Sequence, residues 1–525
     1  MTQVNDSAAS DANYVTSALE FFAALGPEEA IVDGDSRFSY ADTRAAVLGM
    51  AAALRAHGVR PGAAVAAVTE NRYGSIFLQL ALHLLGCRTG FVATYAPLRD
   101  QLDFLEYADA DVLIHDSDAG APLIKEIRGR NAPPPVLSLG PGGAGPDLLA
   151  EMAARMAQGP QPFDSRSVTT QPEALFYTSG TTGQPKLVLH RHRFYQALFA
   201  GGQLYRAIGE PPMRHLGLPA FSTTSGQMPA LLALFQGGSI VLMEDFDMAT
   251  FLAMIERERI TSTFIGPLRL YEMLQHPALP QTDVSSLRYL NCGASAPAPA
   301  RLAEAIDRLG KVMRLVYGMT EAPLITDLPF LDHDPAHPER LSSCGTPFAD
   351  ARVEIRDDKG TALPAGEAGA VWVSGSLVMD EYWRQPELTA QTLVDGWLHT
   401  GDIGYLDADG FLYLVDRSKD VIITGRGDQK VYSRVVEDIL TSHPAILAAA
   451  VIGVPDEELG EAVHAFVVRR PGAAVTAEEL HDLVATDLKE LYAPRDVEFV
   501  DALPLTPMDK VDKKALRARY LARRH

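Results

Sequence analysis

Helical and extended sequence patterns alternate from about residue 16 to residue 400, and this alternation restricts the fold more than any other feature of the chain. It predicts α/β architecture, with helices layered on sheets. Residues 64–69 and 111–115 are predicted as short buried strands, and residues 128–147, rich in Pro and Gly, as a loop or linker. A chain of 525 residues is too long for one hydrophobic core, so we expect two or more domains.

The pattern changes near residue 350. Short alternating strands separated by Asp-Gly turns predict a barrel-like or antiparallel β subdomain there. The polar string 416–420 then separates two apolar strands, and we place the domain boundary at this string. The sequence therefore predicts a large N-terminal domain, residues 1–416, and a small α+β C-terminal domain, residues 417–525.

Within the small domain, residues 433–442 and a segment from about 477 show helical patterns. Thr476 and Glu479 have the spacing of a capping box at the start of the second helix. Strands are expected at 420–424, near 447–453 and near 463–469.

Residues 177–186 lie between two apolar segments and contain a run of small and flexible residues. This run cannot contribute to a core. It consists of Thr178, Ser179, Gly180, Thr181, Thr182 and Gly183, with Lys186 shortly after. Glycine allows close approach of the backbone to a ligand, and successive N–H groups form an anion-binding nest. The run is not a Walker loop, because two residues separate its last glycine from the lysine. We interpret it as a cradle for a polyphosphate.

Charge and cysteine content exclude several classes of protein. The net charge is −21, which disfavours nucleic acid as a partner because such proteins usually carry a basic face. Three cysteines form neither a disulfide framework nor a metal-ligand pattern, so a reducing compartment is expected. The polar, acidic start of the chain does not resemble a signal peptide, and no run of 18 apolar residues predicts a membrane span. We therefore expect a cytoplasmic protein that is not integral to a membrane.

Four further strings follow the polyphosphate loop in order. They are Tyr317-Gly318-Met319-Thr320-Glu321, Trp397-Leu398-His399-Thr400-Gly401-Asp402, Asp416-Arg417, and the C-terminal segment around Lys510. Together the five strings resemble the adenylate-forming superfamily of acyl-CoA synthetases, peptide-synthetase adenylation domains and luciferases. The resemblance runs from about residue 20 to the C-terminus. It implies an ATP-dependent, AMP-forming ligase that activates a carboxylic acid as its adenylate, releases pyrophosphate and passes the acyl group to a second nucleophile.

The resemblance also implies roles for individual residues. The cradle 178–183 would hold the β- and γ-phosphates with help from Lys186, while Thr320 would contact the α-phosphate. Glu321 would bind Mg²⁺, a hard cation that prefers oxygen ligands, with Thr178 as a second candidate ligand. Lys510 would reach in from the mobile small domain to bridge the acid and the α-phosphate, and Lys419 occupies the hinge position.

The remaining candidates concern the nucleoside and the acid. Tyr317 would pack on adenine beside the turn Gly293-Ala294-Ser295. Asp402 would accept hydrogen bonds from the ribose hydroxyls, and Arg417 would contact ribose or phosphate. The candidate acid pocket comprises His215, Phe221, Ser222, Gly293 and Gly318. For His215 the sequence leaves two alternatives, a pocket position or a place in a loop.

Departures from the family pattern leave the acceptor open. The family often has histidine where this chain has Ser222, and residues 425–435 differ from the usual loop, with Ser433 for proline and Val435 for glutamate. In the family this loop lines the pantetheine tunnel. One interpretation is transfer of a small or aromatic acid to a thiol, that of CoA or of a carrier protein. The alternative is an amine acceptor, either in an amide ligase or in a diazotase that activates nitrite for an arylamine. Both kinds of acceptor fit an enzyme of secondary-metabolite biosynthesis. A nucleotide-binding module without catalytic activity is disfavoured, because the chain keeps the full set of motif residues.

Overall fold

The computed structural model describes residues 13–92, 94, 96–116, 120–129, 133–178, 186–329, 338–424, 429–456, 458–506 and 510–523. The chain divides into two compact units. The first unit comprises Met1–Phe246 and Met379–Thr389, and the second comprises Asp247–Val378 and Ala390–His525. The chain therefore returns to the first unit for one short segment after entering the second.

A seven-stranded sheet forms one layer of the first unit, in the order β18-β8-β7-β4-β3-β5-β6. Its strands are β3 (Ala64–Val68), β4 (Arg88–Phe91), β5 (Val112–His115), β6 (Val136–Ser138), β7 (Glu173–Thr178), β8 (Lys186–Arg191) and β18 (Glu381–Tyr382). The pairs among β3, β4, β5, β6 and β7 are parallel, whereas β8 is antiparallel to both neighbours. Strands β3 and β5 are buried along their whole length, as expected of parallel strands covered on both faces. Part of the cover comes from α4 (Leu98–Tyr107) and α5 (Ala121–Arg128), whose apolar side chains join the same core.

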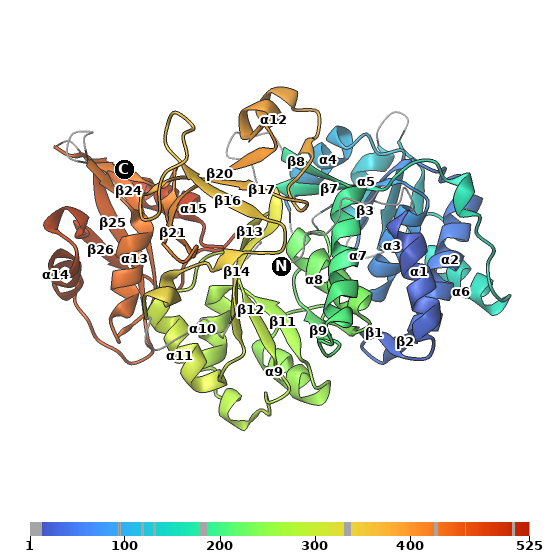
Figure 1. Ribbon diagram of the computed structural model, residues 1–525, viewed down its shortest axis with the longest axis horizontal. Coiled ribbons are helices and arrows are strands. Elements are labelled where there is room, and N and C mark those ends of the chain that lie inside the picture. Colours follow the sequence, from blue (N-terminus) through green and yellow to red (C-terminus); the bar gives the residue numbers. More distant parts are fainter. Residues whose placement is uncertain are drawn as a thin grey trace. The chain divides into compact units, whose positions relative to one another are not determined.

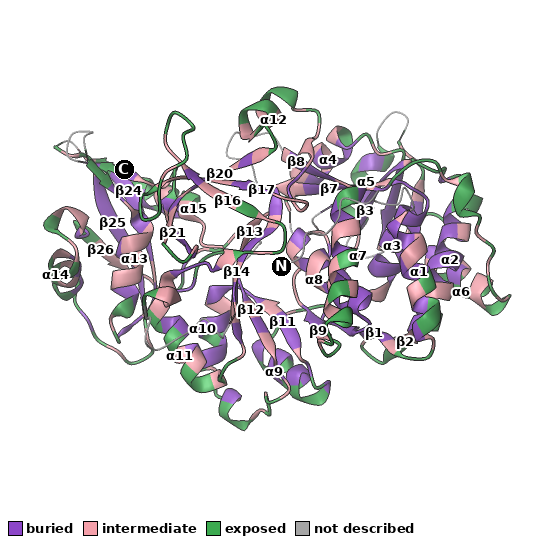
Figure 2. Ribbon diagram, viewed as in Figure 1, coloured by how far each residue is buried: buried purple, intermediate pink, exposed green. Residues whose placement is uncertain are grey.

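Four more strands of this unit pair in the order β9-β10-β1-β2. They are β1 (Glu29–Asp33), β2 (Ser36–Ser39), β9 (Arg214–Gly217) and β10 (Ser239–Leu242). The helices of the unit are α1 (Tyr14–Leu25), α2 (Tyr40–Ala56), α3 (Tyr73–Leu84), α6 (Leu148–Ala157), α7 (His192–Ala207) and α8 (Thr224–Gln236). They pack on one another, as Figure 1 shows for α1, α2 and α3, and much of their inner surface is buried in Figure 2. At their centre the rings of Tyr14 and Tyr195 stack with centroids 5.4 Å apart.

The second unit begins with helices and parallel strands and continues into antiparallel sheets (Figure 1). Its first strands are β11 (Ser262–Ile265), β12 (Tyr289–Cys292), β13 (Met313–Met319), β14 (Ala322–Leu328) and β15 (Thr346–Pro347). Strands β11, β12 and β13 are parallel, and β14 reverses direction through a tight hairpin with β13. The accompanying helices are α9 (Met248–Arg257), α10 (Pro267–Gln275) and α11 (Pro299–Leu309).

The antiparallel subdomain expected after residue 350 is present. It contains β16 (Arg352–Arg356), β17 (Gly369–Ser374), β19 (Leu393–Val394), β20 (Trp397–Leu406) and β21 (Leu412–Arg417). Strand β20 pairs with β17, β19 and β21, so it is the centre of this sheet. A short helix, α12 (Pro386–Thr392), precedes β19.

The C-terminal region is an α+β arrangement, also as expected. Its elements are β22 (Ile422–Thr424), β23 (Gln429–Val431), α13 (Ser433–Ser442), β24 (Ile446–Asp456), β25 (Gly460–Arg469), α14 (Ala477–Asp487), β26 (Asp496–Phe499) and α15 (Lys513–Arg523). Helix α14 begins with the predicted capping box, in which the Thr476 and Glu479 side chains bond each other's backbone N–H groups. Helix α13 has the predicted bounds, and the long β24–β25 hairpin carries apolar side chains into two cores.

The α/β class with a smaller C-terminal domain is thus confirmed. One local prediction was incomplete: the Pro- and Gly-rich stretch 128–147 contains the short strand β6, which pairs with β5. Three residues are too few to show a strand period in the sequence. The boundary at 416–417 stays a prediction.

Candidate active site

Asp402 is a buried carboxylate with two side-chain partners in the second unit. The Tyr317 hydroxyl donates a hydrogen bond of 2.6 Å to its Oδ2 atom, and the Arg417 Nε atom lies 3.3 Å from its Oδ1 atom. Burial, and then the adjacent Asp402 charge, hold the pKa of Tyr317 well above its usual value. Tyr317 therefore remains a hydrogen-bond donor, and the Asp402 carboxyl group has more acceptor positions than these two partners occupy.

Strand pairing positions this carboxylate. Asp402 in β20 lies directly opposite Arg417 in β21, and Tyr317 comes from β13. The Thr400 hydroxyl accepts the Asp402 backbone N–H at 3.1 Å and donates to the Val371 carbonyl of β17 at 2.9 Å. Local sheet geometry thus brings together three residues that are far apart in the sequence.

Lys510 lies among four charged residues of the same unit. Its segment is held by a bridge between Leu505 and Val511 and by hydrogen bonds in both directions with Thr506. Burial is the main cause that lowers the pKa of Lys510, to about 8. The positive charges of Arg417 and Lys419 act in the same direction, and the carboxylates of Asp402 and Glu321 oppose them.

Glu321 and Thr320 lie in the turn between β13 and β14. Glu321 is buried, with 7% of its surface exposed. A Cβ atom at Gly318, in the same hairpin, would lie 2.2 Å from the Pro323 carbonyl oxygen, so only glycine fits there. Among the described residues no three histidine, cysteine or carboxylate side chains form a metal site. A single buried carboxylate still fits Mg²⁺, which is commonly held by one or two carboxylates together with substrate phosphates.

The turn after β12 contains the predicted adenine neighbours. A Cβ atom at Gly293 would come within 2.8 Å of Val316, so a larger residue would displace β13. Ala294 has a positive φ of 70°, an uncommon conformation for a residue with a side chain, and Ser295 is exposed. Preceding this turn, Cys292 is buried, and burial raises the pKa of its thiol to about 12, so it is not poised as a nucleophile.

The first unit holds the two ends of the predicted phosphate cradle. Thr178 is the last residue of β7, and its register partner Lys186 is the first residue of β8. The intervening candidates Ser179, Gly180, Thr181, Thr182 and Gly183 lie outside the described residues. The structure therefore places the ends of the cradle at adjacent strand termini.

Two acid-pocket candidates of the first unit, His215 and Phe221, are buried. His215 lies on β9 rather than in a loop, and burial lowers its pKa to about 4, so it is neutral. The Phe221 ring packs edge-to-face on Phe91 with centroids 5.6 Å apart. Ser222 is partly exposed just before the Thr223 cap of α8. Their contact with an acid stays a prediction.

The predicted hinge residue Lys419 follows β21. Burial, and then the positive charge of Arg417, lower its pKa. Just before it, the Asp416 carboxylate accepts the backbone N–H groups of Arg417 and Ser433 at 2.7 and 2.5 Å. The Lys513 ammonium donates to the Ser433 hydroxyl at 2.7 Å and lies 2.8 Å from Glu437. No local sequence pattern indicates this polar cluster, because only tertiary packing brings its members together.

The ring centroid of Tyr382 lies 5.4 Å from the Lys186 ammonium, a contact that the sequence did not predict. Tyr382 belongs to the two-residue strand β18, which is too short to show a period in the sequence. Almost 200 positions separate Tyr382 from Lys186 in the sequence, so no local sequence pattern predicts their contact.

Comparison with known proteins gives consistent results over nearly the whole chain. Residues 20–383 match the family described as AMP-binding enzyme, and residues 435–510 match the AMP-binding enzyme C-terminal domain. The medium/long-chain-fatty-acid–CoA ligase FadD8 of Mycobacterium tuberculosis is 36% identical, over 93% of this chain and 86% of the relative. A feruloyl-CoA synthase of an Amycolatopsis species is 34% identical, over 94% and 96%. Among solved structures, the amide bond synthetase McbA from Marinactinospora thermotolerans superposes with a TM-score of 0.86 at 37% identity, covering 96% of this chain and all of that one.

Proposed function

The chain belongs to the AMP-binding enzyme family, and from this premise we propose that it activates a small or aromatic carboxylic acid as its adenylate and then transfers the acyl group to a thiol. It is an ATP-dependent, AMP-forming ligase that uses ATP with Mg²⁺. The identity of the acid, the identity of the acceptor and the role of each residue are proposals. Similarity to a feruloyl-CoA synthase supports an aromatic acid, and the small polar segment 222–226 supports a polar or small one.

The assignment of roles rests on the Arg417–Asp402 ion pair and on the electrostatic interaction of the buried Lys510 with Asp402, Arg417 and Glu321. In the proposed reaction a carboxylate oxygen attacks the α-phosphorus of ATP, the bond to the β-phosphate oxygen breaks, and pyrophosphate leaves. Two anions must approach each other in this step. Lys510 neutralises that charge, and a preorganised cation in a partly desolvated site stabilises the transition state more than water does.

The other residues hold ATP. Asp402 accepts hydrogen bonds from ribose, and Arg417 contacts ribose or phosphate. Tyr317, fixed through its hydroxyl by Asp402, presents its ring to adenine beside Gly293, Ala294 and Ser295. The cradle 178–183 with Lys186 binds the terminal phosphates, Thr320 the α-phosphate, and Glu321 supplies the carboxylate for Mg²⁺.

In the second step the acceptor attacks the acyl carbonyl, loses a proton, and displaces AMP. A thiol of CoA or of a carrier protein is the first proposal. An amine is the second, and two observations favour it. They are the similarity to an amide bond synthetase, and the replacements Ser433 and Val435 at the start of α13, in the segment that the family uses for pantetheine. An arylamine that receives activated nitrite belongs to the same class of acceptor.

Pyrophosphate release tests the proposal. The full chain is incubated with ATP, Mg²⁺ and a panel of acids that includes nitrite, with CoA, a carrier protein, amines, an arylamine, or no acceptor. Turnover that requires a thiol supports the first acceptor, and turnover that requires an amine supports the second. No pyrophosphate with any acid would contradict the proposed function.

Lys510→Ala provides the matched test of mechanism. We expect a loss of adenylation of about a hundredfold to a thousandfold, the range seen when a preorganised charge-stabilising donor is removed, with ATP binding largely kept. Lys514→Ala, an exposed lysine on α15, is the control and should behave as the parent. Pyrophosphate release by Lys510→Ala at the parent rate would refute the assigned role.

None of the helices in the described part of the chain combines the length and apolarity needed to cross a membrane. A cytoplasmic location stays a proposal.

A further inference from the structure

The segment 379–389, here called the edge strap, returns from the second unit's sequence to form the edge of the first unit's sheet. It runs antiparallel to β8, with Glu381 opposite Leu189 and Tyr382 opposite Val188. The backbone N–H groups on either side of this pair extend the ladder: Asp380 donates to Leu189 at 2.9 Å, and Trp383 donates to Leu187 at 2.8 Å. The edge strap therefore has a fixed register on the strand that begins with Lys186.

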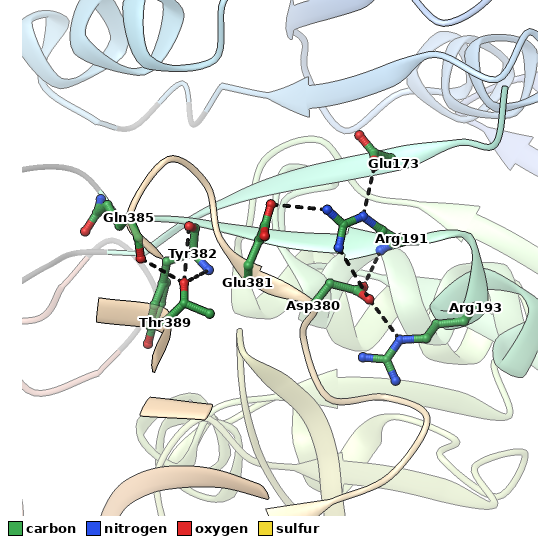
Figure 3. Close-up of polar contacts among 8 residues, drawn as sticks. All are labelled: Glu173, Arg191, Arg193, Asp380, Glu381, Tyr382, Gln385 and Thr389. Atoms are coloured by element: carbon green, nitrogen blue, oxygen red, sulfur yellow. Dashed lines mark hydrogen bonds and ion pairs between the residues drawn. The ribbon is translucent and has the colours of Figure 1, made fainter. Parts of the chain in front are cut away.

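Ion pairs anchor one end of the edge strap (Figure 3). The Asp380 carboxylate accepts the Arg191 backbone N–H at 2.8 Å and the Arg193 Nε–H at 3.1 Å. The Arg191 guanidinium lies between Glu173 of β7 and Glu381 of the strap, at 3.1 and 3.2 Å. Because the Asp380 side chain is only 14% exposed, solvent screens these pairs less than ordinary surface pairs.

The other end is fixed by packing and hydrogen bonds. The Trp383 indole N–H donates to the Tyr107 carbonyl at 3.0 Å, and the Arg88 guanidinium lies 4.1 Å from the Trp383 ring centroid. The Thr389 hydroxyl accepts the Tyr382 N–H at 3.0 Å and donates to the Gln385 carbonyl at 2.8 Å (Figure 3). Tyr382, 5% exposed, thus has a backbone that is held from both sides.

The Tyr382 ring lies next to the Lys186 ammonium, whose Nζ atom is 5.4 Å from the ring centroid. Such a distance falls within the range in which the negative face of an aromatic ring attracts a cation. Lysine carries four rotatable bonds and loses rotamer entropy whenever it is fixed on a ligand. A ring that already restricts the ammonium lowers the part of that entropy cost that falls at the moment of binding.

We propose that Tyr382 is a positioning residue for Lys186, whose ammonium its ring holds at the start of β8 to meet an anionic oxygen of the triphosphate. The inference rests on the proposed function, since it assigns Lys186 to the phosphates. Tyr382 touches neither ATP nor the acid in this proposal. Its ring restricts the position of the Lys186 ammonium, and the edge strap in turn fixes the position of Tyr382.

ATP affinity of the full chain, measured by calorimetry with Mg²⁺, tests the inference without knowledge of the acid. Tyr382→Phe keeps the ring and should bind ATP as the parent does. Tyr382→Leu removes the ring and should raise the Kd for ATP about twofold to tenfold, the factor expected from ordering one long side chain at binding. Pentafluorophenylalanine at position 382 keeps the shape but reverses the charge distribution of the ring, so it should behave like Tyr382→Leu even if that variant folds poorly.

A double-variant cycle separates positioning from mere structure. In a Lys186→Ala background, Tyr382→Leu should cause no further loss of ATP affinity. Phe21→Leu is the matched control, because Arg206 lies 5.6 Å from the Phe21 ring in a cation–π contact that the proposal does not use. This control should leave the Kd for ATP unchanged.

The outcomes distinguish the inference from its premise. If Lys186→Ala weakens ATP binding but the leucine and pentafluorophenylalanine variants do not, the inference is wrong and the proposed function stands. Equal losses from Tyr382→Leu with and without Lys186 would also overturn it, by indicating a structural role. If Lys186→Ala binds ATP as the parent does, or the parent binds no ATP, the phosphate assignment itself fails, and the inference fails with it.

Discussion

Lys510 owes its expected reactivity to its surroundings. Burial lowers its pKa to about 8, well below the usual range for lysine, and two cations and two carboxylates also influence this pKa. Burial is the largest cause of this lowered pKa, and the four charges act in opposite directions. Close to neutral pH the Lys510 amine is therefore mostly protonated, but the pH is only slightly below its pKa. The approach of an anionic substrate would raise this pKa and favour the charged form.

A pH dependence follows from this pKa. The protonated form attracts the two anions, and its fraction falls as pH rises through about 8 rather than at the much higher pH where an ordinary lysine titrates. We expect kcat/KM for ATP in pyrophosphate release to fall tenfold per pH unit above that point, because this ratio reports the free enzyme. Stopped assays across the alkaline range measure it.

Lys510→Arg is the control for this titration. A guanidinium stays protonated throughout the range, so the variant should lose the alkaline decline even if its rate is lower. A decline of the same midpoint in both proteins would show that another group titrates.

Asp402 illustrates how one residue serves several partners. Tyr317 and Arg417 each engage one of its oxygens, yet an ionised carboxylate offers about four acceptor positions. The two partners fix its orientation and leave acceptor positions for the ribose hydroxyls that we propose it binds. The sequence predicted the carboxylate, but the hydroxyl–carboxylate hydrogen bond needed the fold.

At the scale of elements, periodic segments were predictable and short ones were not. Helix α13 has the bounds that its pattern predicts, because its apolar side chains recur at helical spacing over ten residues. Strands β6 and β18 are set by their neighbours in the sheet instead. Sequence motifs make Asp402 and Lys510 candidate site residues, whereas the contact of Tyr382 with Lys186 depends on where the edge strap joins the sheet.

The capping box of α14 gives a prediction at this scale. Thr476→Ala removes the side chain that accepts the Glu479 N–H at 3.1 Å, and we expect a loss of about 1 kcal/mol in the free energy of unfolding. Glu479→Gln keeps a side chain able to complete the box and should cost much less. Chemical denaturation followed by circular dichroism measures both. Equal stability of the alanine variant and the parent would mean that α14 does not depend on its cap.

At the scale of the molecule, the second unit holds its C-terminal region against α11 by a small polar contact. The buried Arg301 guanidinium donates to the Ile446 carbonyl at 2.5 Å and to Glu304 at 2.6 Å, and Arg470 donates to the same Glu304 at 2.7 Å. In this arrangement the Asp402 carboxylate acts electrostatically on Lys510. If the C-terminal domain swings between adenylation and transfer, as the family resemblance implies, this contact must break.

Arg470→Ala tests that coupling, because it weakens the contact without touching the site. Loss of a partly exposed ion pair should lower the population of the arrangement that carries Lys510 to Asp402, and slow adenylation about twofold to fivefold. Transfer from preformed acyl-adenylate, followed by AMP release, should be unchanged or faster, because it does not need that arrangement. The two half-reactions are measured separately with the acid that the substrate panel identifies.

Arg519→Ala is the control. It breaks an ion pair with Glu498 inside the C-terminal region and should change neither rate. Equal slowing of both half-reactions by Arg470→Ala would argue against a swing that this contact restrains.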